Sequence, residues 1–386
     1  MKLANTTAKG LRGTSFRPYP AVIVIIIGLL FTLISSGCLA KQQKQVGKSV
    51  YKSSTEKVAR VGVVLASGGP KEQLLNQSVG AALKRAGEAF GTEYLVLEHG
   101  ELASAREAMN YLANNGYHLI LGLSSAQTND LVETAKEFPD LLFAMLDEEI
   151  QGPNIVAVTF REEESAFLAG ALAALLTKTN IVAFIGGADV PAINRQEKGY
   201  KAGVDYVNKL EQRNIPVQVK ADYAGMFAKA FKDPDKGKAM ALADIDYGAD
   251  IIFQAAGNTG DGVLAAAAER GIKAIGSGPN QNVLFPGTVL TSTMKIMDQG
   301  IYQILEDFTT DNLKSGKRSL GIKQGAVDLI DLKSITPAEN AALANNAAGL
   351  AALKAMKDSI PPEVVDKLNI IRDQLTKGNI TVDIGK

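Results

Sequence analysis

Several polar side chains follow apolar runs of the chain, at positions where they could hold a small molecule. Asp147 comes directly after the run LLFAML, and its carboxylate can accept hydrogen bonds from hydroxyl or ring N–H groups of a ligand. The alternative role for Asp147 is to cap a helix or loop. The acidic residues that follow it are typical of a solvent-exposed face, which favours this alternative. Lys295 ends the run TVLTSTM, where a buried ammonium group requires an acidic partner. Asn76 and Gln77 carry amides that donate and accept hydrogen bonds, so they join the candidate ligand-binding residues.

A glycine-rich segment, AAGNTGDG at residues 255–262, is a further candidate for ligand contact. Glycine lets the backbone approach a ligand closely, and the free N–H groups at the start of a helix attract oxygen-rich groups. Packing of a helix against a strand also favours glycine in such turns. Both roles therefore stay open for Gly257, Asn258 and Thr259.

Nucleotide-binding and catalytic motifs are missing from the sequence. The glycine pairs at residues 68–69 and 186–187 lack the Gly-Lys-Ser/Thr end of a phosphate loop and the dinucleotide fingerprint, which disfavours ATP and NAD. A serine elbow, an HExxH motif and a Cys–His pair are absent as well. His99 and His118 flank apolar runs, as structural histidines do. The sequence therefore predicts no enzyme, no catalytic residue, no metal site and no cofactor.

Alternating elements place the candidate residues at strand ends. Short β-branched runs alternate with longer helical patterns, which predicts an α/β fold with parallel sheets and right-handed crossovers. The alternation restarts after residue 160, so we expect two Rossmann-like lobes with a hinge at residues 157–162. In open α/β sheets, ligands bind beyond the carboxyl ends of the strands. The predicted strands are residues 58–66, 92–99, 118–124, 141–147, 154–160, 180–187, 216–223, 249–257, 273–278 and 288–295. The predicted helices are residues 74–90, 105–114, 130–137, 165–178, 199–210, 236–247 and 260–270.

The lobes are assigned to consecutive parts of the chain. We expect lobe 1 at residues 58–156 and lobe 2 at residues 157–283, with residues 284–386 supplying hinge return strands and C-terminal helices to both. Residues 335–356 are alanine-rich and helical in pattern, and we expect them to pack against a lobe or to extend a surface helix. Basic and acidic side chains number 41 each, which leaves no basic excess for binding nucleic acid.

The N-terminal residues form a targeting segment. Residues 1–37 combine basic residues, an apolar run at 21–34 and small residues, which together describe a secretory signal peptide. The run is shorter than the roughly 20 residues of a membrane-spanning helix. Cys38, the only cysteine, follows in the manner of a bacterial lipobox, in which the cysteine is lipidated; Ser35 stands where that pattern prefers Leu. An uncleaved anchor is the alternative, and both place the body outside the cytoplasm on a membrane tether. Residues 38–57 are polar and predict a flexible linker.

The chain resembles the basic membrane lipoprotein (PnrA-like) family of ABC transporter substrate-binding proteins over residues 58–384. The most specific matching segments are residues 159–187 and the AAGNTGDGV turn. The further matching segments are LLNQSVGAALKRA, EFPDLLFAMLD, GYKAGVDY, DPDKGKAMA, TVLTSTMK and IPPEVVDKLNIIRDQLTKGNITV. The resemblance implies a type I periplasmic-binding-protein fold whose lobes close around a purine nucleoside.

In this family the base stacks between aromatic side chains, and charged side chains hold the ribose. The residues that match the family's binding pattern by position are Asn76, Asp147, Gly257 and Lys295. Phe231 matches the aromatic residue of the second lobe, and Phe227 is its rival because the loop alignment is loose.

Two departures from the family weaken the expected grip on a nucleoside. Leu75 stands where an aromatic residue usually stacks on the base. The family turn Gly-Val-Asp-x-Asp-Gln reads GSGPNQ here, so Gly278 replaces the carboxylate that grips the ribose. Asn280 replaces the second carboxylate and stays among the candidate ligand-binding residues. Loss of a charged partner costs about 1.5–3 kcal/mol, roughly ten- to a hundred-fold in affinity. Loss of a stacking aromatic costs about 1–3 kcal/mol more.

We therefore expect an extracytoplasmic, lipid-anchored substrate-binding protein of an ABC importer. It binds a small solute, a nucleoside or a nucleoside-like molecule, and passes it to the permease subunits. A ligand sensor or regulator of the same fold is the first alternative. An extracytoplasmic enzyme acting on nucleosides is the less favoured one.

Overall fold

The computed structural model describes residues 58–65, 70–98 and 104–385, and of residues 70–77 it describes the backbone alone. The described residues all belong to one compact unit, residues 48–386. Cys38, the predicted signal peptide and the predicted linker lie outside the described residues.

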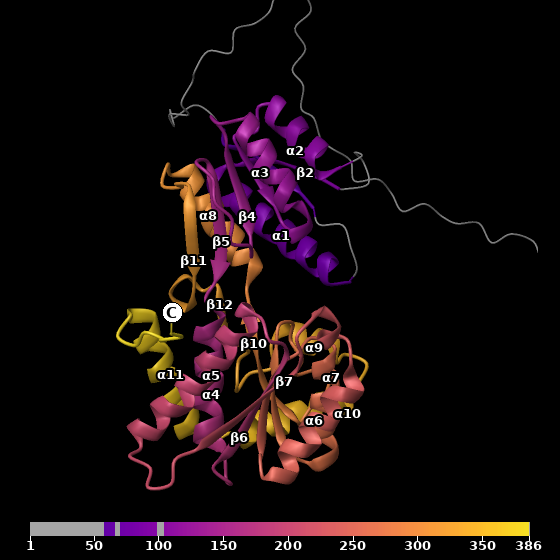
Figure 1. Cartoon of the computed structure of the whole chain (residues 1–386), viewed down its shortest axis with the longest axis vertical. Helices are drawn as coiled ribbons and strands as arrows, with labels where there is room; N and C mark the ends of the chain where they lie inside the picture. The colour runs from indigo at the N-terminus through magenta and orange to yellow at the C-terminus, as the bar shows by residue number, and fades with distance from the viewer. Residues whose placement is uncertain (1–57, 66–69, 99–103, 386) are drawn as a thin grey trace, which may run out of the picture. The chain divides into compact units, whose positions relative to one another are not determined.

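Sheet 1 is a six-stranded parallel sheet within the described residues, in the order β11-β5-β4-β3-β1-β2. Five of its strands come from consecutive βα units, whereas β11 returns from late in the chain and lies beside β5 (Figure 1). Its strands are β1 (Arg60–Val64), β2 (Glu93–Leu97), β3 (Leu119–Gly122), β4 (Leu142–Leu146), β5 (Ile155–Phe160) and β11 (Gly316–Leu320).

Sheet 2, likewise six-stranded where the chain is described, has the order β12-β10-β9-β8-β6-β7. All neighbours are parallel except β12, which pairs antiparallel with β10. Its strands are β6 (Ile181–Ala188), β7 (Gln218–Gly225), β8 (Ile251–Ala255), β9 (Lys273–Ser277), β10 (Val289–Lys295) and β12 (Val327–Leu329). The two sheets of βαβ units confirm the predicted α/β fold class.

The chain passes between the sheets after β5, after β10 and after β11. The first passage leads into α4 (Glu162–Leu176), which packs against α5 and β12. The second leads into α8 (Met297–Thr309), which packs against α1, and the third runs through η3 (Ile322–Gln324). The predicted boundary between residues 156 and 157 falls within β5, and the predicted return strands correspond in position to β11 and β12.

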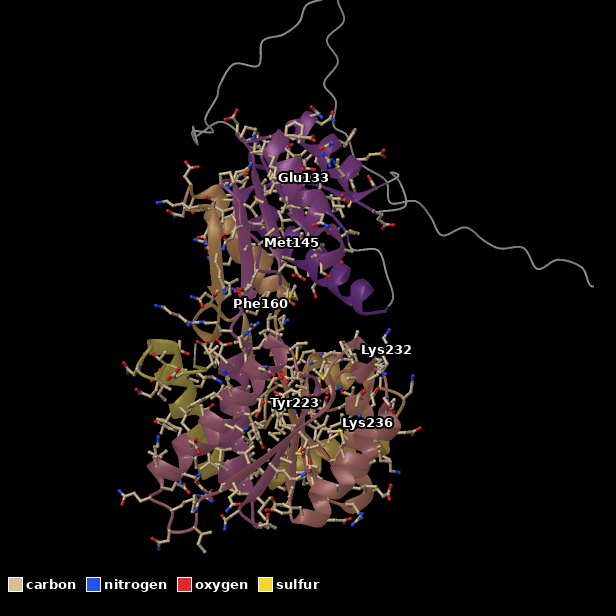
Figure 2. All side chains as sticks on the ribbon, in the orientation of Figure 1. Glu133, Met145, Phe160, Tyr223, Lys232 and Lys236 are labelled. Carbon is tan, nitrogen blue, oxygen red and sulfur yellow. The ribbon has the colours of Figure 1, made fainter. Side chains whose placement is uncertain are left out.

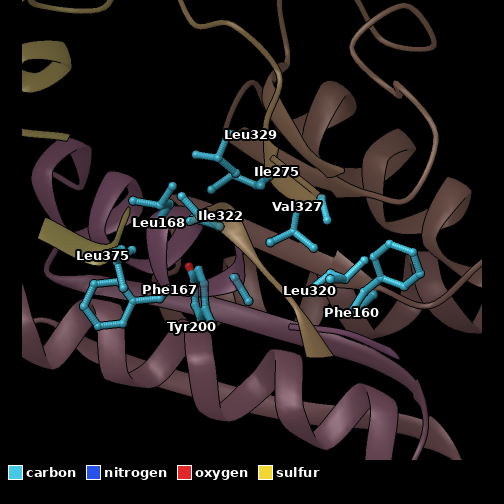
Figure 3. Close-up of a cluster of buried hydrophobic side chains, with 14 of the residues drawn as sticks. Phe160, Phe167, Leu168, Tyr200, Ile275, Leu320, Ile322, Val327, Leu329 and Leu375 are labelled. Carbon is cyan, nitrogen blue, oxygen red and sulfur yellow. The ribbon is translucent and has the colours of Figure 1, made fainter. Parts of the chain in front are cut away.

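The remaining helices cover the sheets or continue the C-terminal segment (Figure 1). They are α1 (Pro70–Phe90), α2 (Ala105–Asn114), α3 (Thr128–Glu137), α5 (Pro191–Leu210), α6 (Pro234–Tyr247), α7 (Thr259–Arg270), α9 (Pro337–Ala342), α10 (Ala347–Ser359) and α11 (Pro362–Lys377). One buried apolar cluster includes Phe160 and Leu320 from sheet 1 and Ile275 and Val327 from sheet 2 (Figure 3). Of the helices that are described, none is both long and apolar enough to cross a bilayer.

Four helical predictions need correction, the first being α1, which begins at Pro70 rather than at residue 74. Helix α4 begins at Glu162 rather than at residue 165, because acidic residues in the first turn suit the positive end of a helix dipole. Helix α5 begins at Pro191 rather than at residue 199, since proline is tolerated in the first turn. Residues 335–356 form two helices rather than one. The break comes before Asn346, whose side chain accepts a hydrogen bond from Gly349 N–H and starts α10.

Candidate functional site

An ion pair joins the strand ends of the two sheets. Lys295, the last residue of β10, places its Nζ 2.7 Å from Oδ2 of Asp147, which directly follows β4. The backbone of Asp147 has a φ of 64°, a left-handed conformation that Asp tolerates better than most side chains. Its N–H donates to the carbonyl oxygen of Val158 at 2.7 Å, which ties this residue to β5. The structure thus brings together two residues that the sequence singled out separately.

Glu162 extends this pair into a longer polar chain. As the first residue of α4, it places Oε1 3.3 Å from Nζ of Lys295. Gln196 of α5 donates from Nε2 to the same Glu162 oxygen at 3.4 Å. The Ser277 hydroxyl, at the end of β9, donates to Oε1 of Gln196 at 3.1 Å. The carboxyl ends of β4, β9 and β10 and the starts of two helices thus meet in one hydrogen-bonded chain.

Sequence reasoning missed Glu162, Gln196 and Ser277. The first two lie in helical turns that precede the predicted helix starts. The signals that could have found them were the acidic run at residues 162–164 and the proline at position 191.

This group holds two carboxyl groups and one ammonium group, because Asp147 and Glu162 both pair with Lys295. Burial raises the pKa of Glu162, and Asp147 adds to the shift although Lys295 opposes it. Burial alone would lower the pKa of Lys295, but Glu162 and Asp147 outweigh it and the pKa is raised. The Phe160 ring, at the end of β5 (Figure 2), lies with its centroid 5.8 Å from Lys295 Nζ. Such a group can accept hydrogen bonds from ligand hydroxyl or N–H groups and donate one charged hydrogen bond.

The glycine-rich turn between β8 and α7 is packed closely against η2 (Ala228–Phe231). Gly257 has a φ of 58°, and a Cβ added there would lie 3.3 Å from the carbonyl oxygen of Phe231. Asn258 donates its backbone N–H to that same oxygen at 3.0 Å. Thr259 is fully buried, and its hydroxyl donates to the carbonyl oxygen of Ala230 and accepts from the N–H of Asp233, both at 2.8 Å. The Thr259 side chain therefore joins η2 to α7 instead of facing outward.

The two candidate aromatic residues of sheet 2 differ in exposure. Phe231 is half-buried, and its ring lies where a side chain at Gly187 would stand, because a Cβ added there would overlap the ring atoms. Phe227, at the start of η2, is 70% exposed. Gly187 thus leaves room for the Phe231 ring, whereas Phe227 presents its ring to solvent.

The turn after β9 contains the position at which a carboxylate was expected. Gly278 has a φ of 91°, and a Cβ added there would have no heavy atom within 4 Å. Its N–H donates to the carbonyl oxygen of Thr293 at 3.0 Å, which anchors the turn to β10. The Asn280 side-chain oxygen accepts from the N–H of Asn282 at 3.1 Å. The turn therefore has room at Gly278 for the side chain that is missing.

Two further candidates, Asn76 and Gln77, lie in α1, and their side chains are outside the described residues. Among the side chains that the structure does describe, no group of His, Cys, Asp or Glu is arranged to hold a metal ion.

Known proteins resemble this chain in sequence. Residues 59–348 match a family model described as "ABC transporter substrate-binding protein PnrA-like". A CD4+ T-cell-stimulating antigen of Listeria monocytogenes is 36% identical over 62% of the chain and 66% of its own length. The ABC transporter nucleoside-binding protein BmpA of Lactococcus lactis is 31% identical over 67% of the chain and 70% of its own length. The match covers less than two thirds of the Listeria monocytogenes protein and 57% of a Listeria innocua relative.

Among solved structures, a solute-binding protein of an ABC transporter system from Aeropyrum pernix superimposes with a TM-score of 0.61. It is 23% identical, and the match covers 86% of the chain and 94% of that protein. This likeness concerns the fold, which is that of the type I periplasmic-binding proteins.

Proposed function

The chain belongs to the PnrA-like family of ABC transporter substrate-binding proteins, and on this premise we propose that it captures a small solute outside the cytoplasm for an ABC importer. The family match over residues 59–348 includes the elements that carry the polar chain from Asp147 to Ser277. The permease subunits of the importer are the proposed partners.

The observation that carries this proposal is the ion group of Asp147, Lys295 and Glu162. It draws on both sheets and lies at the strand ends where open α/β sheets bind ligands. A ligand that contacts residues of both sheets binds most tightly to the conformation in which those residues are close together. It shifts the conformational equilibrium toward that state by the difference in its affinity for the two states. Capture of a solute and a signal to the permease then follow from one binding event.

We propose a nucleoside-like ligand, such as a modified purine nucleoside. Support comes from the Lactococcus lactis relative, which is named a nucleoside-binding protein. Asp147 and Glu162 can accept hydrogen bonds from ribose or base donors, and the half-buried turn at Gly278 can approach the ligand through its backbone. Gly278 removes one family contact to the ribose and Leu75 removes one to the base, so the nucleoside should be held less tightly than in relatives that retain both.

The proposed location is the outer face of the cell membrane. The apolar run at residues 21–34 and the single Cys38 support export and lipid anchoring at Cys38. The polar stretch at residues 38–57 would serve as the linker between the lipid and the folded unit.

Mass spectrometry of the small molecule that co-purifies with the full chain tests the ligand assignment. Calorimetry with inosine, guanosine and adenosine then gives the affinities. We expect a purine nucleoside or a close analogue to co-purify and at least one of the three to bind. If all three fail to bind below millimolar concentration and the bound molecule is not nucleoside-like, the proposed ligand class is wrong.

A further inference from the structure

A fully buried ion pair lies in the C-terminal segment, in the region of α9 and α10. Nζ of Lys357 in α10 is 2.8 Å from Oε2 of Glu339 in α9, and both side chains have an exposed fraction of 0%. The other two N–H groups of the ammonium donate to the carbonyl oxygens of Asp331 at 2.7 Å and Ser334 at 2.8 Å. Every donor of Lys357 therefore has a partner.

Glu339 uses both carboxylate oxygens. Oε2 also accepts from the backbone N–H of Thr336 at 2.8 Å, which completes a capping box at the start of α9. Oε1 accepts from the side-chain amide of Asn282 at 2.8 Å. Burial opposes ionisation of Glu339, but the hydrogen bonds from Lys357, Thr336 and Asn282 outweigh it and lower the pKa of the carboxyl. The C-terminal segment is thus connected through a charged group to the end of the turn that follows β9.

The network continues from Asn282 into β10 and the turn. Asn282 is fully buried, and its side-chain oxygen accepts from the Ser292 hydroxyl at 2.9 Å. The hydroxyl oxygen of Ser292 accepts from the Gln281 N–H at 3.1 Å. The side-chain oxygen of Gln281 accepts from the N–H of Ser277 at 2.9 Å and from the amide of Gln254. The hydrogen bonds therefore reach both ends of the turn that contains Gly278.

Gln254 carries the same network to the glycine-rich turn. It lies in β8, is fully buried, and its side-chain oxygen accepts from the N–H of Ala256 at 2.9 Å. The turns that contain Gly257 and Gly278 are therefore connected through buried side chains to one ion pair in the C-terminal segment.

A buried ion pair seldom adds net stability over apolar residues of similar volume, because desolvation of both charges offsets their attraction. Its geometry, by contrast, is demanding, since each donor and acceptor has to meet its partner. We propose that residues 331–357 form a positioning segment. In it Glu339 and Lys357, acting through Asn282, hold the turns at Gly278 and Gly257 in place for ligand. The effect on ligand affinity rests on the proposed function, whereas the effect on the turns does not.

The test of turn positioning needs no ligand. Hydrogen–deuterium exchange is measured on the full chain and on Asn282→Leu, which removes the connection to Glu339 but leaves the Glu339–Lys357 pair. We expect amides of residues 277–282 to exchange about tenfold faster in this variant, as loss of a buried hydrogen bond to a charged group implies. Glu339→Gln, a milder change, should also speed the hydrogen–deuterium exchange of the same amides. Adding it to Asn282→Leu should have no further effect on them, because the connection is already lost.

Leu353→Ala is the matched control. Leu353 lies in α10, is fully buried and makes apolar contacts in the core, so this variant destabilises the same segment without touching the network. Lys354→Ala removes a charge from an exposed pair of α10 and should change nothing in the turn. Equal acceleration of residues 277–282 in Leu353→Ala, or unchanged exchange in Asn282→Leu and Glu339→Gln, would overturn the proposal.

Calorimetry with inosine, guanosine and adenosine tests the effect on affinity. We expect about tenfold weaker binding of the nucleoside by Asn282→Leu and unchanged affinity in Leu353→Ala. Unchanged affinity in Asn282→Leu, together with faster exchange, would overturn the affinity effect alone. If the wild-type chain binds none of the three nucleosides, the proposed function and the affinity effect fail together, and the exchange result still decides whether the segment positions the turns.

Discussion

Replacement of Gly278 by aspartate should strengthen nucleoside binding. The added carboxylate would enter space in which a Cβ meets no heavy atom within 4 Å, in a turn anchored by the N–H of Gly278 on Thr293. If it reaches the vicinal hydroxyls of a ribose, a charged hydrogen bond worth about 1.5–3 kcal/mol forms. Affinity for inosine should then rise by roughly ten- to a hundred-fold.

The substitution also has a cost in stability. A φ of 91° is unfavourable for any residue with a Cβ, by about 1–2 kcal/mol. If the turn keeps this backbone when ligand binds, the cost lowers the free energy of unfolding and leaves the affinity gain intact. Calorimetry and chemical denaturation of the same variant measure the two effects separately.

Two controls make the result decisive. Gly278→Asn introduces the same shape and backbone cost without the charge, and it should gain much less affinity. An inosine analogue without the 2′- and 3′-hydroxyls should gain nothing from Gly278→Asp. Equal affinities for the Asp and Asn variants, or an equal gain for the analogue, would refute the reasoning that Gly278 stands at a ribose-gripping position.

Three further changes test other parts of the account. Lys295→Met leaves Asp147 and Glu162 without their cation and should weaken solute binding at least tenfold by calorimetry. The exposed Lys317→Met, whose partner is Glu149, should leave binding unchanged. Because the pKa of Glu162 is raised above its ordinary value of 4.5, its contribution to stability is present below that pH and is lost as pH rises through the raised pKa. Chemical denaturation between pH 4 and pH 7 should therefore show a flatter pH dependence for Glu162→Gln, and an unchanged slope would contradict this assignment. Cys38→Ala should release the protein from the membrane fraction or leave it unprocessed, and unchanged lipidation by mass spectrometry would contradict the predicted anchor.

Most strand positions could be predicted from sequence because those strands are short apolar runs. The strands β11, with the sequence GKRSL, and β12, with the sequence VDL, lack such a run and were expected only as return strands within residues 284–386. The run that ends at residue 147 corresponds to β4, and the run that ends at residue 295 corresponds to β10. The sequence also singled out Asp147 and Lys295 as residues of unusual type at strand ends. That they pair with each other depends on the passage of the chain between two sheets, which periodicity within one segment does not reveal.

Helix starts were the weaker part of the prediction. The apolar pattern of α4 begins after its acidic first turn, so Glu162 was placed in a hinge and its contact with Lys295 was missed. Gln196 was missed for the same reason, since α5 begins well before its apolar stripe.

The C-terminal segment shows a different limit of the sequence. The alanine-rich pattern of residues 335–356 predicted helical structure but no role for it. The role of Glu339 depends on its partners Lys357 and Asn282, which are distant along the chain and cannot be read from alanine content.

The central claim is that one solute is held by residues of both sheets at once. Hydrogen–deuterium exchange of the full chain with and without saturating inosine tests it most directly. We expect slower exchange both after β4, around Asp147, and at the end of β10, around Lys295. Protection confined to one sheet, or none at either strand end, would contradict it.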